Sequence, residues 1–194
     1  MNMVAKLLSL EDILVDIDVS GKPELFEAIG LHMEHKHGLR QQWVSQALSR
    51  REQVGSTGLG MGFAIPHARV KELERIQVAF LRLKKPIPFE SVDAQPVFEL
   101  LVLLVPKQAT EEHLRILANA TEMFSDRGFR ARLQQCVTPS AVKRQFDAWP
   151  HPPTSGGEDV DVPAPSSATP AKSPLFRFGE LFSPRPLGWR LIHR

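Results

Sequence analysis

The chain has 194 residues, of which 42% are hydrophobic, enough for one globular domain with a sizeable core and an appendage. Its 24 basic and 22 acidic side chains leave a formal net charge of +2, which gives no electrostatic reason to expect nucleic acid or anionic lipid as a partner. The single cysteine, Cys136, excludes an intrachain disulfide and suits a reducing compartment. Because neither a signal-peptide pattern nor a bilayer-length apolar run is visible, we expect a cytoplasmic protein without stable membrane insertion.

The first fifty residues contain one strand pattern and two helix patterns. Leu14–Asp18 is typical of a short strand. Lys22–His37 predicts a helix, and Gly38 follows it at the usual left-handed stop. Gln41–Arg50 predicts a second helix. The residues expected to face inward are Leu25, Phe26, Ile29 and Met33 of the first helix and Trp43, Val44, Ala47 and Leu48 of the second.

The following hundred residues mix strands with helices. Phe98–Val105 is apolar on both alternating faces, as expected for a central strand covered on both sides. Thr110 is predicted to cap a helix that continues to Phe124, with acidic residues in its first turn. The other expected elements are a strand at Ile76–Leu83 and helices at Phe129–Gln135 and Ser140–Trp149. Without a regular βαβ repeat, this order predicts an α/β fold in which a mixed β-sheet is sandwiched between α-helices in a single domain.

The composition changes sharply after Trp149. Nine of the sixteen prolines lie between Pro150 and Arg194, and a Ser/Thr/Pro/Gly stretch runs from Pro152 to Pro174. We therefore predict a domain over residues 1–149 and a disordered Pro-rich tail over 150–194. The end of the tail interleaves aromatic residues with arginines, which is compatible with a docking peptide for a partner or membrane surface. Composition alone favours a dispensable extension or a terminal reading-frame accident.

Three of the seven histidines share the segment HMEHKH. His32 and His35 are spaced to meet on one helical face, whereas His37 is expected to lie at the negative end of the helix. Zinc normally needs three or four convergent ligands, so the pattern argues against a metal site here. We predict neither a metal nor a cofactor for this chain.

His67 differs from the other histidines in its neighbourhood. It follows Pro66, whose fixed φ stiffens the chain, and it closes the apolar run Phe63–Ile65. Glycines 55, 58, 60 and 62 lie upstream, where backbone can approach a ligand or turn tightly. Their spacing matches neither a P-loop nor a dinucleotide fingerprint. The pattern alone leaves a structural role for His67 open beside a functional one.

Other polar groups could join His67 in a site. His113 lies in the first turn of the predicted helix, where it could face an anion or simply be hydrogen-bonded at the margin of the core. Arg50 and Arg51 end the preceding helix, where they complement its dipole and could also bind phosphate oxygens. Ser56 and Thr57 add hydroxyl groups. These groups suit phosphoryl transfer through a histidine, because neutral imidazole is a good nucleophile near pH 7.

The stretch Arg51–Arg69, REQVGSTGLGMGFAIPHAR, resembles the phosphorylation-site signature of the fructose/mannitol-type IIA components of the bacterial phosphotransferase system. It most resembles the nitrogen-regulatory IIA proteins. PIPFESVDAQPV, LLVP and HLRILANATEMF extend the likeness in the same order, over about Leu8 to Trp149. The resemblance implies an α/β fold with a mixed sheet flanked by helices.

The resemblance also implies roles for particular residues. His67 would accept the phosphoryl group, His113 and Arg51 would help to hold it, and Ser56 and Thr57 would line the same site. The donor would be an HPr-like phosphocarrier, and the targets would be regulatory partners such as potassium-transport or sensor proteins. The chain would then be a phosphotransferase component rather than a free-standing enzyme.

Two departures and two alternatives accompany this resemblance. The chain reads His67-Ala68-Arg69 where the nitrogen-regulatory pattern usually reads His-Gly-Lys, and the tail has no counterpart in that pattern. A sugar-specific IIA component that passes phosphate to a separate IIB partner is one alternative. The other is an interaction module in which His67 is no longer phosphorylated. A serine hydrolase is disfavoured, because no G-x-S-x-G elbow is present.

Overall fold

Two long antiparallel strands, β5 (Gln77–Ile87) and β6 (Val97–Pro106), form the centre of the computed structural model, which describes residues 2–108 and 111–150. The described residues belong to one compact unit. The other elements are α1 (Met3–Leu7), β1 (Leu8–Ile17), α2 (Lys22–His37), α3 (Gln41–Val54), β2 (Gly58–Gly60), β3 (Phe63–Ala64), β4 (His67–Val70), α4 (Glu111–Ser125), α5 (Arg127–Gln134) and α6 (Pro139–Ala148).

The sheet is mixed, as predicted. Its strand order is β1-β5-β6-β3-β2, and β4 pairs with β6 beyond the end of β3. β1 runs parallel to β5, whereas β3 and β4 both run parallel to β6. Among the described strands, β4 pairs with β6 alone, so its other side is open to side chains from neighbouring helices.

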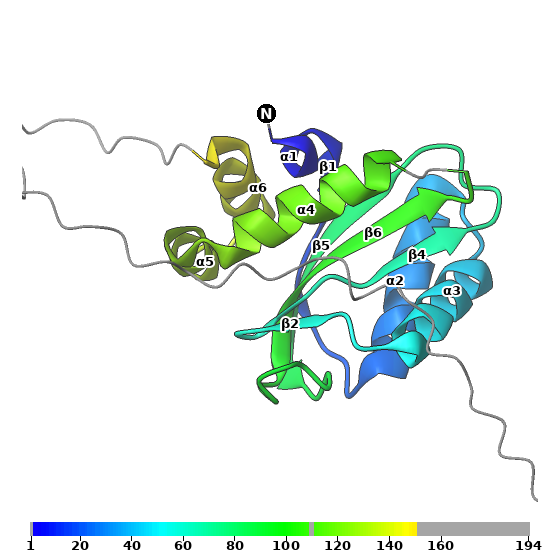
Figure 1. Ribbon diagram of the computed structural model, residues 1–194, viewed down its shortest axis with the longest axis horizontal. Helices are drawn as coiled ribbons and strands as arrows, with labels where there is room; N and C mark the ends of the chain where they lie inside the picture. The colour runs from blue at the N-terminus through cyan, green and yellow to red at the C-terminus, as the bar shows by residue number, and fades with distance from the viewer. Residues whose placement is uncertain (1, 109–110, 151–194) are drawn as a thin grey trace, which may run out of the picture. The chain divides into compact units, whose positions relative to one another are not determined.

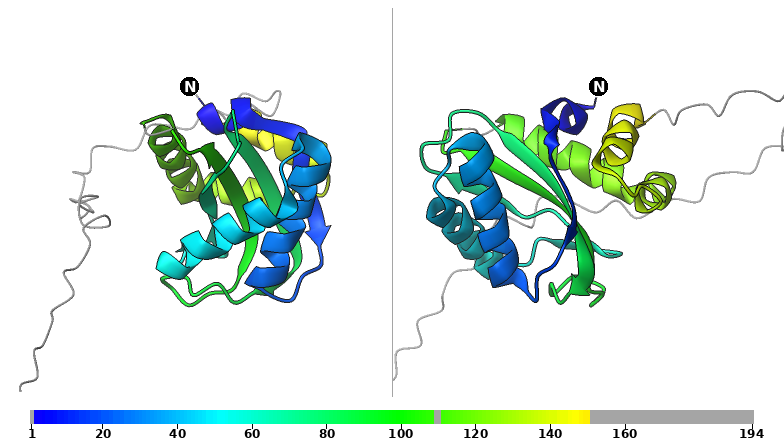
Figure 2. Two further views of the ribbon diagram at one scale, coloured as in Figure 1. Left: turned by 90° about the vertical axis from the view of Figure 1, so that its right-hand side faces the viewer. Right: turned by 180° about the vertical axis from the view of Figure 1, so that it is seen from behind.

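Side chains of β6 alternate between two hydrophobic cores, one on each face of the sheet. Leu100, Val102 and Leu104 pack with α2 and α3, whereas Leu101, Leu103 and Val105 pack with α1, α4, α5 and α6. Figures 1 and 2 show these two helical layers on opposite faces of the sheet. The apolar pattern of β6 is thus explained by burial on both faces, which confirms its prediction as a central strand.

Local signals placed the helices well. α2 has the predicted bounds, and Gly38 ends it in the left-handed conformation with φ 68°. α3 runs to Val54, four residues beyond the predicted end at Arg50, so that Arg51 and Glu52 are helical. The main error concerns the glycine-rich segment, for which no strand bounds were predicted beyond a strand edge at His67 and in which three short strands occur. α1 was not predicted either, and β1 starts at Leu8 rather than at Leu14.

Two sequence predictions lie outside the described residues. They are the helix cap at Thr110 and the disordered tail beyond Pro150. No helix within residues 2–108 and 111–150 is long and apolar enough to cross a lipid bilayer.

A buried ion pair between Arg82 and Glu99 joins the two central strands to each other and to the end of α5. Glu99 on β6 is fully buried, and its Oε1 accepts a hydrogen bond from Arg82 Nε on β5 at 2.7 Å. The same oxygen forms an ion pair with Arg82 Nη2 at 2.6 Å. Burial raises the pKa of Glu99, and the Arg82 charge opposes this rise. Arg82 also donates to the carbonyl oxygens of Leu133 and Cys136, so it ties the end of α5 to the sheet.

We expect Arg82→Met to lower the free energy of unfolding by about 3–5 kcal/mol, because the substitution leaves the carboxyl group of Glu99 buried without its partner. Urea denaturation measures this loss. The matched control is Lys84→Met on the same strand, whose ion pair with Asp18 is exposed and contributes less than about 1 kcal/mol. A loss for Arg82→Met no larger than that for Lys84→Met would contradict this account.

Candidate functional site

His67 is the first residue of β4 and starts its parallel pairing with β6. Its register partner is Leu103, whose backbone N–H donates to the carbonyl oxygen of Pro66 at 2.9 Å. Ala68 and Val70 point into the α2–α3 core, so the alternation of a strand directs His67 to the opposite face. The imidazole is half-buried at an edge strand, where it is fixed by the backbone and still reachable.

The hydrogen bonds of His67 assign its tautomer. Nδ1 lies 2.8 Å from the carbonyl oxygen of Ile65, which can only accept, so Nδ1 carries the proton. Nε2 accepts from Arg51 Nε at 3.1 Å, and it therefore holds a lone pair. The neutral ring thus directs its nucleophilic nitrogen toward a guanidinium group.

The surroundings of His67 favour this neutral form. Burial lowers the pKa of His67 below its ordinary 6.5, and the charges of Arg51 and His113 lower it further. The hydrogen bond to the Ile65 carbonyl and the nearby Glu52 carboxylate act in the opposite direction. The net effect keeps the imidazole uncharged at neutral pH, as a nitrogen nucleophile requires.

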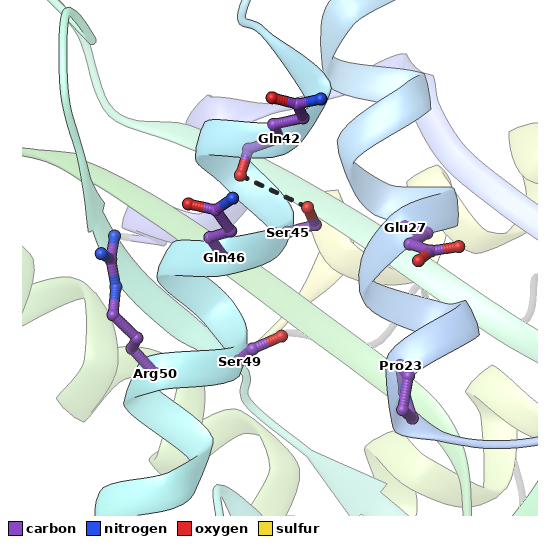
Figure 3. Close-up of a pocket in the computed structure, with 7 residues that line it drawn as sticks. All are labelled: Pro23, Glu27, Gln42, Ser45, Gln46, Ser49 and Arg50. Carbon is purple, nitrogen blue, oxygen red and sulfur yellow. Dashed lines mark hydrogen bonds between the residues drawn. The ribbon is translucent and has the colours of Figure 1, made fainter.

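Arg50 and Arg51 both lie within α3, which continues to Val54, and their side chains point to different surroundings. Arg51 bridges from α3 to His67, and its Nη1 also donates to the carbonyl oxygen of Gly55 at 2.9 Å. Arg50 instead lines a groove between α2 and α3, together with residues such as Glu27 and Gln46 (Figure 3). Only one of the two candidate guanidinium groups therefore contacts His67.

His113 lies half-buried in the first turn of α4. It is close enough to His67 for its charge to lower the pKa of that residue. Its buried Nδ1 has no hydrogen-bond partner among the described residues. A buried polar nitrogen without a partner costs free energy, which a ligand acceptor could recover.

A buried polar network holds the loop between α3 and β2. Glu52 Oε2 accepts from the backbone N–H and the hydroxyl of Thr57, at 3.1 Å and 2.7 Å. Its Oε1 pairs with Lys22 Nζ at 3.0 Å. The Ser56 hydroxyl donates to the carbonyl oxygen of Phe89 at 2.6 Å. Both predicted hydroxyls thus donate to protein acceptors and shape the loop beside Arg51.

The glycines between α3 and β4 allow the backbone to approach neighbouring side chains of the same chain. Gly62 has φ +81°, and a Cβ there would lie 2.2 Å from the ring of Phe98. Gly60 has φ +87°, and a Cβ there would lie 2.9 Å from the Asp93 carboxylate. The tight turn expected from the glycines is therefore present at β2–β3, and the close approach is to this chain's own side chains.

Residues 6–148 match the family described as the phosphoenolpyruvate-dependent sugar phosphotransferase system, EIIA 2. The chain belongs to this family. A nitrogen regulatory protein of Bradyrhizobium diazoefficiens is 34% identical to this IIA domain over 139 residues, which cover 72% of this chain and 91% of the relative. A nitrogen regulatory protein of Pseudomonas aeruginosa is 42% identical over 101 residues, which cover 52% of this chain and 66% of the relative.

Solved structures support the same placement. The crystal structure of the nitrogen regulatory protein IIA-Ntr from Neisseria meningitidis superposes with a TM-score of 0.70 at 36% identity, covering 74% of this chain and 99% of that one. The mannitol IIA structure from Escherichia coli has a TM-score of 0.60 at 20% identity, covering 71% and 97%, so its likeness concerns the fold. This chain is therefore a phosphocarrier of the EIIA family related to the nitrogen regulatory IIA proteins.

The IIA domain accommodates Ala68 within a regular strand. Its side chain is buried in the α2–α3 core, and the residue occupies β4 rather than a turn. Alanine in place of the glycine that is usual in the nitrogen-regulatory pattern therefore needs no change of the backbone after His67, because strand geometry suits alanine at least as well as glycine.

Two parts of the site were missed in the sequence. Glu52 was not singled out, although an acid beside Arg51 and five residues before Thr57 was a weak signal for a loop-holding carboxylate. The Ile65 carbonyl, which sets the tautomer of His67, carries no side-chain signal at all. Helical spacing would allow His32 and His35 to meet, but His32 and His37 instead share the carboxylate of Asp12, and His35 is exposed.

We expect an NMR titration of the imidazole protons to give His67 a pKa below 6.5, so that the ring is neutral at pH 7 and gains a proton only as the pH falls further. Arg51→Gln should raise this pKa, because it removes a nearby positive charge. Arg50→Gln is the control and should leave it unchanged. A pKa of His67 that is unaffected by Arg51→Gln would contradict the assigned contact.

Proposed function

We propose that this IIA domain is a regulatory phosphocarrier, which accepts a phosphoryl group on Nε2 of His67 from an HPr-like donor and controls target proteins according to its phosphorylation state. One observation carries the proposal. The Nδ1 proton is held by the Ile65 carbonyl, which leaves the Nε2 lone pair directed at Arg51. The ring is therefore already in the tautomer that attack through Nε2 requires.

The transfer needs little rearrangement. The Nε2 lone pair attacks the phosphorus of the donor's phosphohistidine in line, so that an N–P bond forms at His67 while the donor's N–P bond breaks. The electron pair of the broken bond stays on the donor nitrogen. The proton of His67 stays on Nδ1, hydrogen-bonded to the Ile65 carbonyl oxygen, so the accepting ring does not have to lose or gain a proton.

We propose that Arg51 and His113 stabilise the negative charge of the phosphoryl group. Arg51 Nε already lies at Nε2, and it can turn to the phosphoryl oxygens when Nε2 becomes bonded to phosphorus. His113 lies at the amino end of α4, where the helix dipole favours an anion, and its unpartnered Nδ1 could donate to one oxygen. Ser56 and Thr57 act by holding the loop next to Arg51.

The regulatory role is favoured over the sugar-specific alternative by the relatives. Nitrogen regulatory proteins match this chain over most of their own length, as in Bradyrhizobium diazoefficiens with 91%. A phosphoryl group adds roughly −1.5 to −2 charges, a large change for a chain with a formal charge of +2. Binding surfaces around His67 would then differ strongly between the two states. We assign this activity to residues 1–149 and propose that it is exerted in the cytoplasm, with potassium-transport or sensor proteins among the targets.

We expect the full chain, incubated with Enzyme I, an HPr-like donor and labelled phosphoenolpyruvate, to take up one acid-labile, base-stable phosphoryl group. His67→Ala should abolish the label. Arg51→Gln should slow transfer by about 100-fold, because a donor aimed at developing charge is lost. The matched control, Arg50→Gln, should change the rate less than about twofold, since Arg50 lines a different groove.

Two results would decide against the proposal. Label that persists in His67→Ala would remove His67 as the acceptor, and absence of label with every donor would favour an interaction module without phosphorylation. Rapid passage of the label to a IIB protein would favour the sugar-specific alternative, for which the complex of mannitol IIA with phosphorylated IIB from Escherichia coli is a structural precedent.

A further inference from the structure

Two histidines of α2 meet one carboxylate of β1. His32 Nε2 and His37 Nε2 each lie 2.8 Å from the same oxygen, Asp12 Oδ1. The three candidate ligand atoms lie within 4.8 Å of one another. We propose that Asp12, His32 and His37 form a zinc-binding site, separate from the phosphoryl-transfer site.

The electrostatics of Asp12 favour a bound cation. Its carboxylate is only 2% exposed, and burial of an anion is costly unless a positive charge compensates it. Its hydrogen-bond partners among the described residues are the two imidazoles and the hydroxyl of Ser9. A divalent ion bound here would place a full positive charge directly against the buried carboxylate.

The donor set suits zinc. Two imidazole nitrogens and one carboxylate oxygen, with water as the fourth ligand, are typical of four-coordinate zinc. Bond lengths of about 2.0–2.2 Å place the ligand atoms of a tetrahedral site roughly 3.3–3.5 Å apart. The two observed separations of 2.8 Å would have to open by roughly half an ångström, and the two imidazole nitrogens, which lie within 4.8 Å of each other, would have to reach the same spacing. Rotation of the side chains can supply both changes. Neutral imidazoles can bind through Nε2 after moving their proton to Nδ1, so no net charge is lost.

The proposed zinc site is accessible from solvent, and neighbouring groups orient its ligands. Asp12 and His37 line a surface hollow of about 540 Å³, through which an ion and its water can enter. The second carboxylate oxygen, Oδ2, is held by the hydroxyl of Ser9, which orients Oδ1 toward the histidines. The two imidazole rings lie edge to face with centroids 6.3 Å apart, so both nitrogens can approach one point without the rings colliding.

The site was not evident in the sequence because its ligands are far apart along the chain. Asp12 precedes His32 by 20 residues and comes from a strand. His32 and His37 are five residues apart, a spacing that does not bring two side chains together on an ideal helix. Only the packing of the last turn of α2 against β1 lets both reach one carboxylate.

Titration of the untagged full chain with Zn²⁺ in the presence of a chromophoric chelator tests the site. We expect one ion per chain, with affinity lowered at least about 10–100-fold by His37→Gln or Asp12→Asn, the range that loss of even an outer-shell partner produces. His35→Gln is the matched control, because His35 lies on the same helix and is exposed. It should leave zinc affinity unchanged.

A second measurement locates the ion and guards against unfolded variants. Anomalous diffraction at the zinc edge of the wild-type chain should show a peak bonded to Asp12 Oδ1, His32 Nε2 and His37 Nε2. Binding weaker than millimolar would overturn the proposal, as would a peak at His67 and His113 or equal losses of affinity in His35→Gln and His37→Gln. Phosphoryl uptake by His67 does not enter this test, so the two proposals fail or stand separately.

Discussion

The parallel pairing of β4 with β6 is the constraint on which the candidate site depends. It starts at His67 and Leu103, and it turns Ala68 and Val70 into the α2–α3 core while His67 faces the other way. Slipping this register by one residue would exchange the two faces and bury an imidazole among apolar side chains. Packing on both faces of the sheet thus fixes the register of β4, and the register places the imidazole of His67 next to Arg51.

Electrostatics then determine the protonation state and the tautomer of the His67 imidazole. Burial and the charge of Arg51 both disfavour an imidazolium, and the Ile65 carbonyl directs the remaining proton to Nδ1. Glu52 acts against Arg51 at His67, yet its own charge is engaged by Lys22 and by the two Thr57 donors. The buried carboxylate of Glu52 therefore orders the loop between α3 and β2 while raising the pKa of His67 only in part.

Local patterns were readable in the sequence, and long-range pairings were not. α2 was placed correctly because its apolar stripe and Gly38 lie within one segment. The strands β3 and β4 were missed because their partner is β6, more than thirty residues further along the chain. β2 pairs with the neighbouring β3 and was missed because glycine-rich segments lack strand propensity. At the site, Arg51 could be suggested from its position, but its separation from Arg50 depends on one more turn of α3. The family resemblance supplied what pattern alone left open for His67.

α2 connects the two clusters of polar residues described above. Lys22 at its first turn pairs with Glu52 beside the candidate site at His67, and His37 at its last turn contacts Asp12. Sixteen helical residues at about 1.5 Å each separate the two ends by about 24 Å. This separation is well beyond a Debye length of about 8–10 Å, and an ion at Asp12 contacts none of the groups bonded to His67. We therefore expect zinc at Asp12 to add to the stability of the α2–β1 contact and to leave the proposed phosphoryl transfer at His67 unchanged.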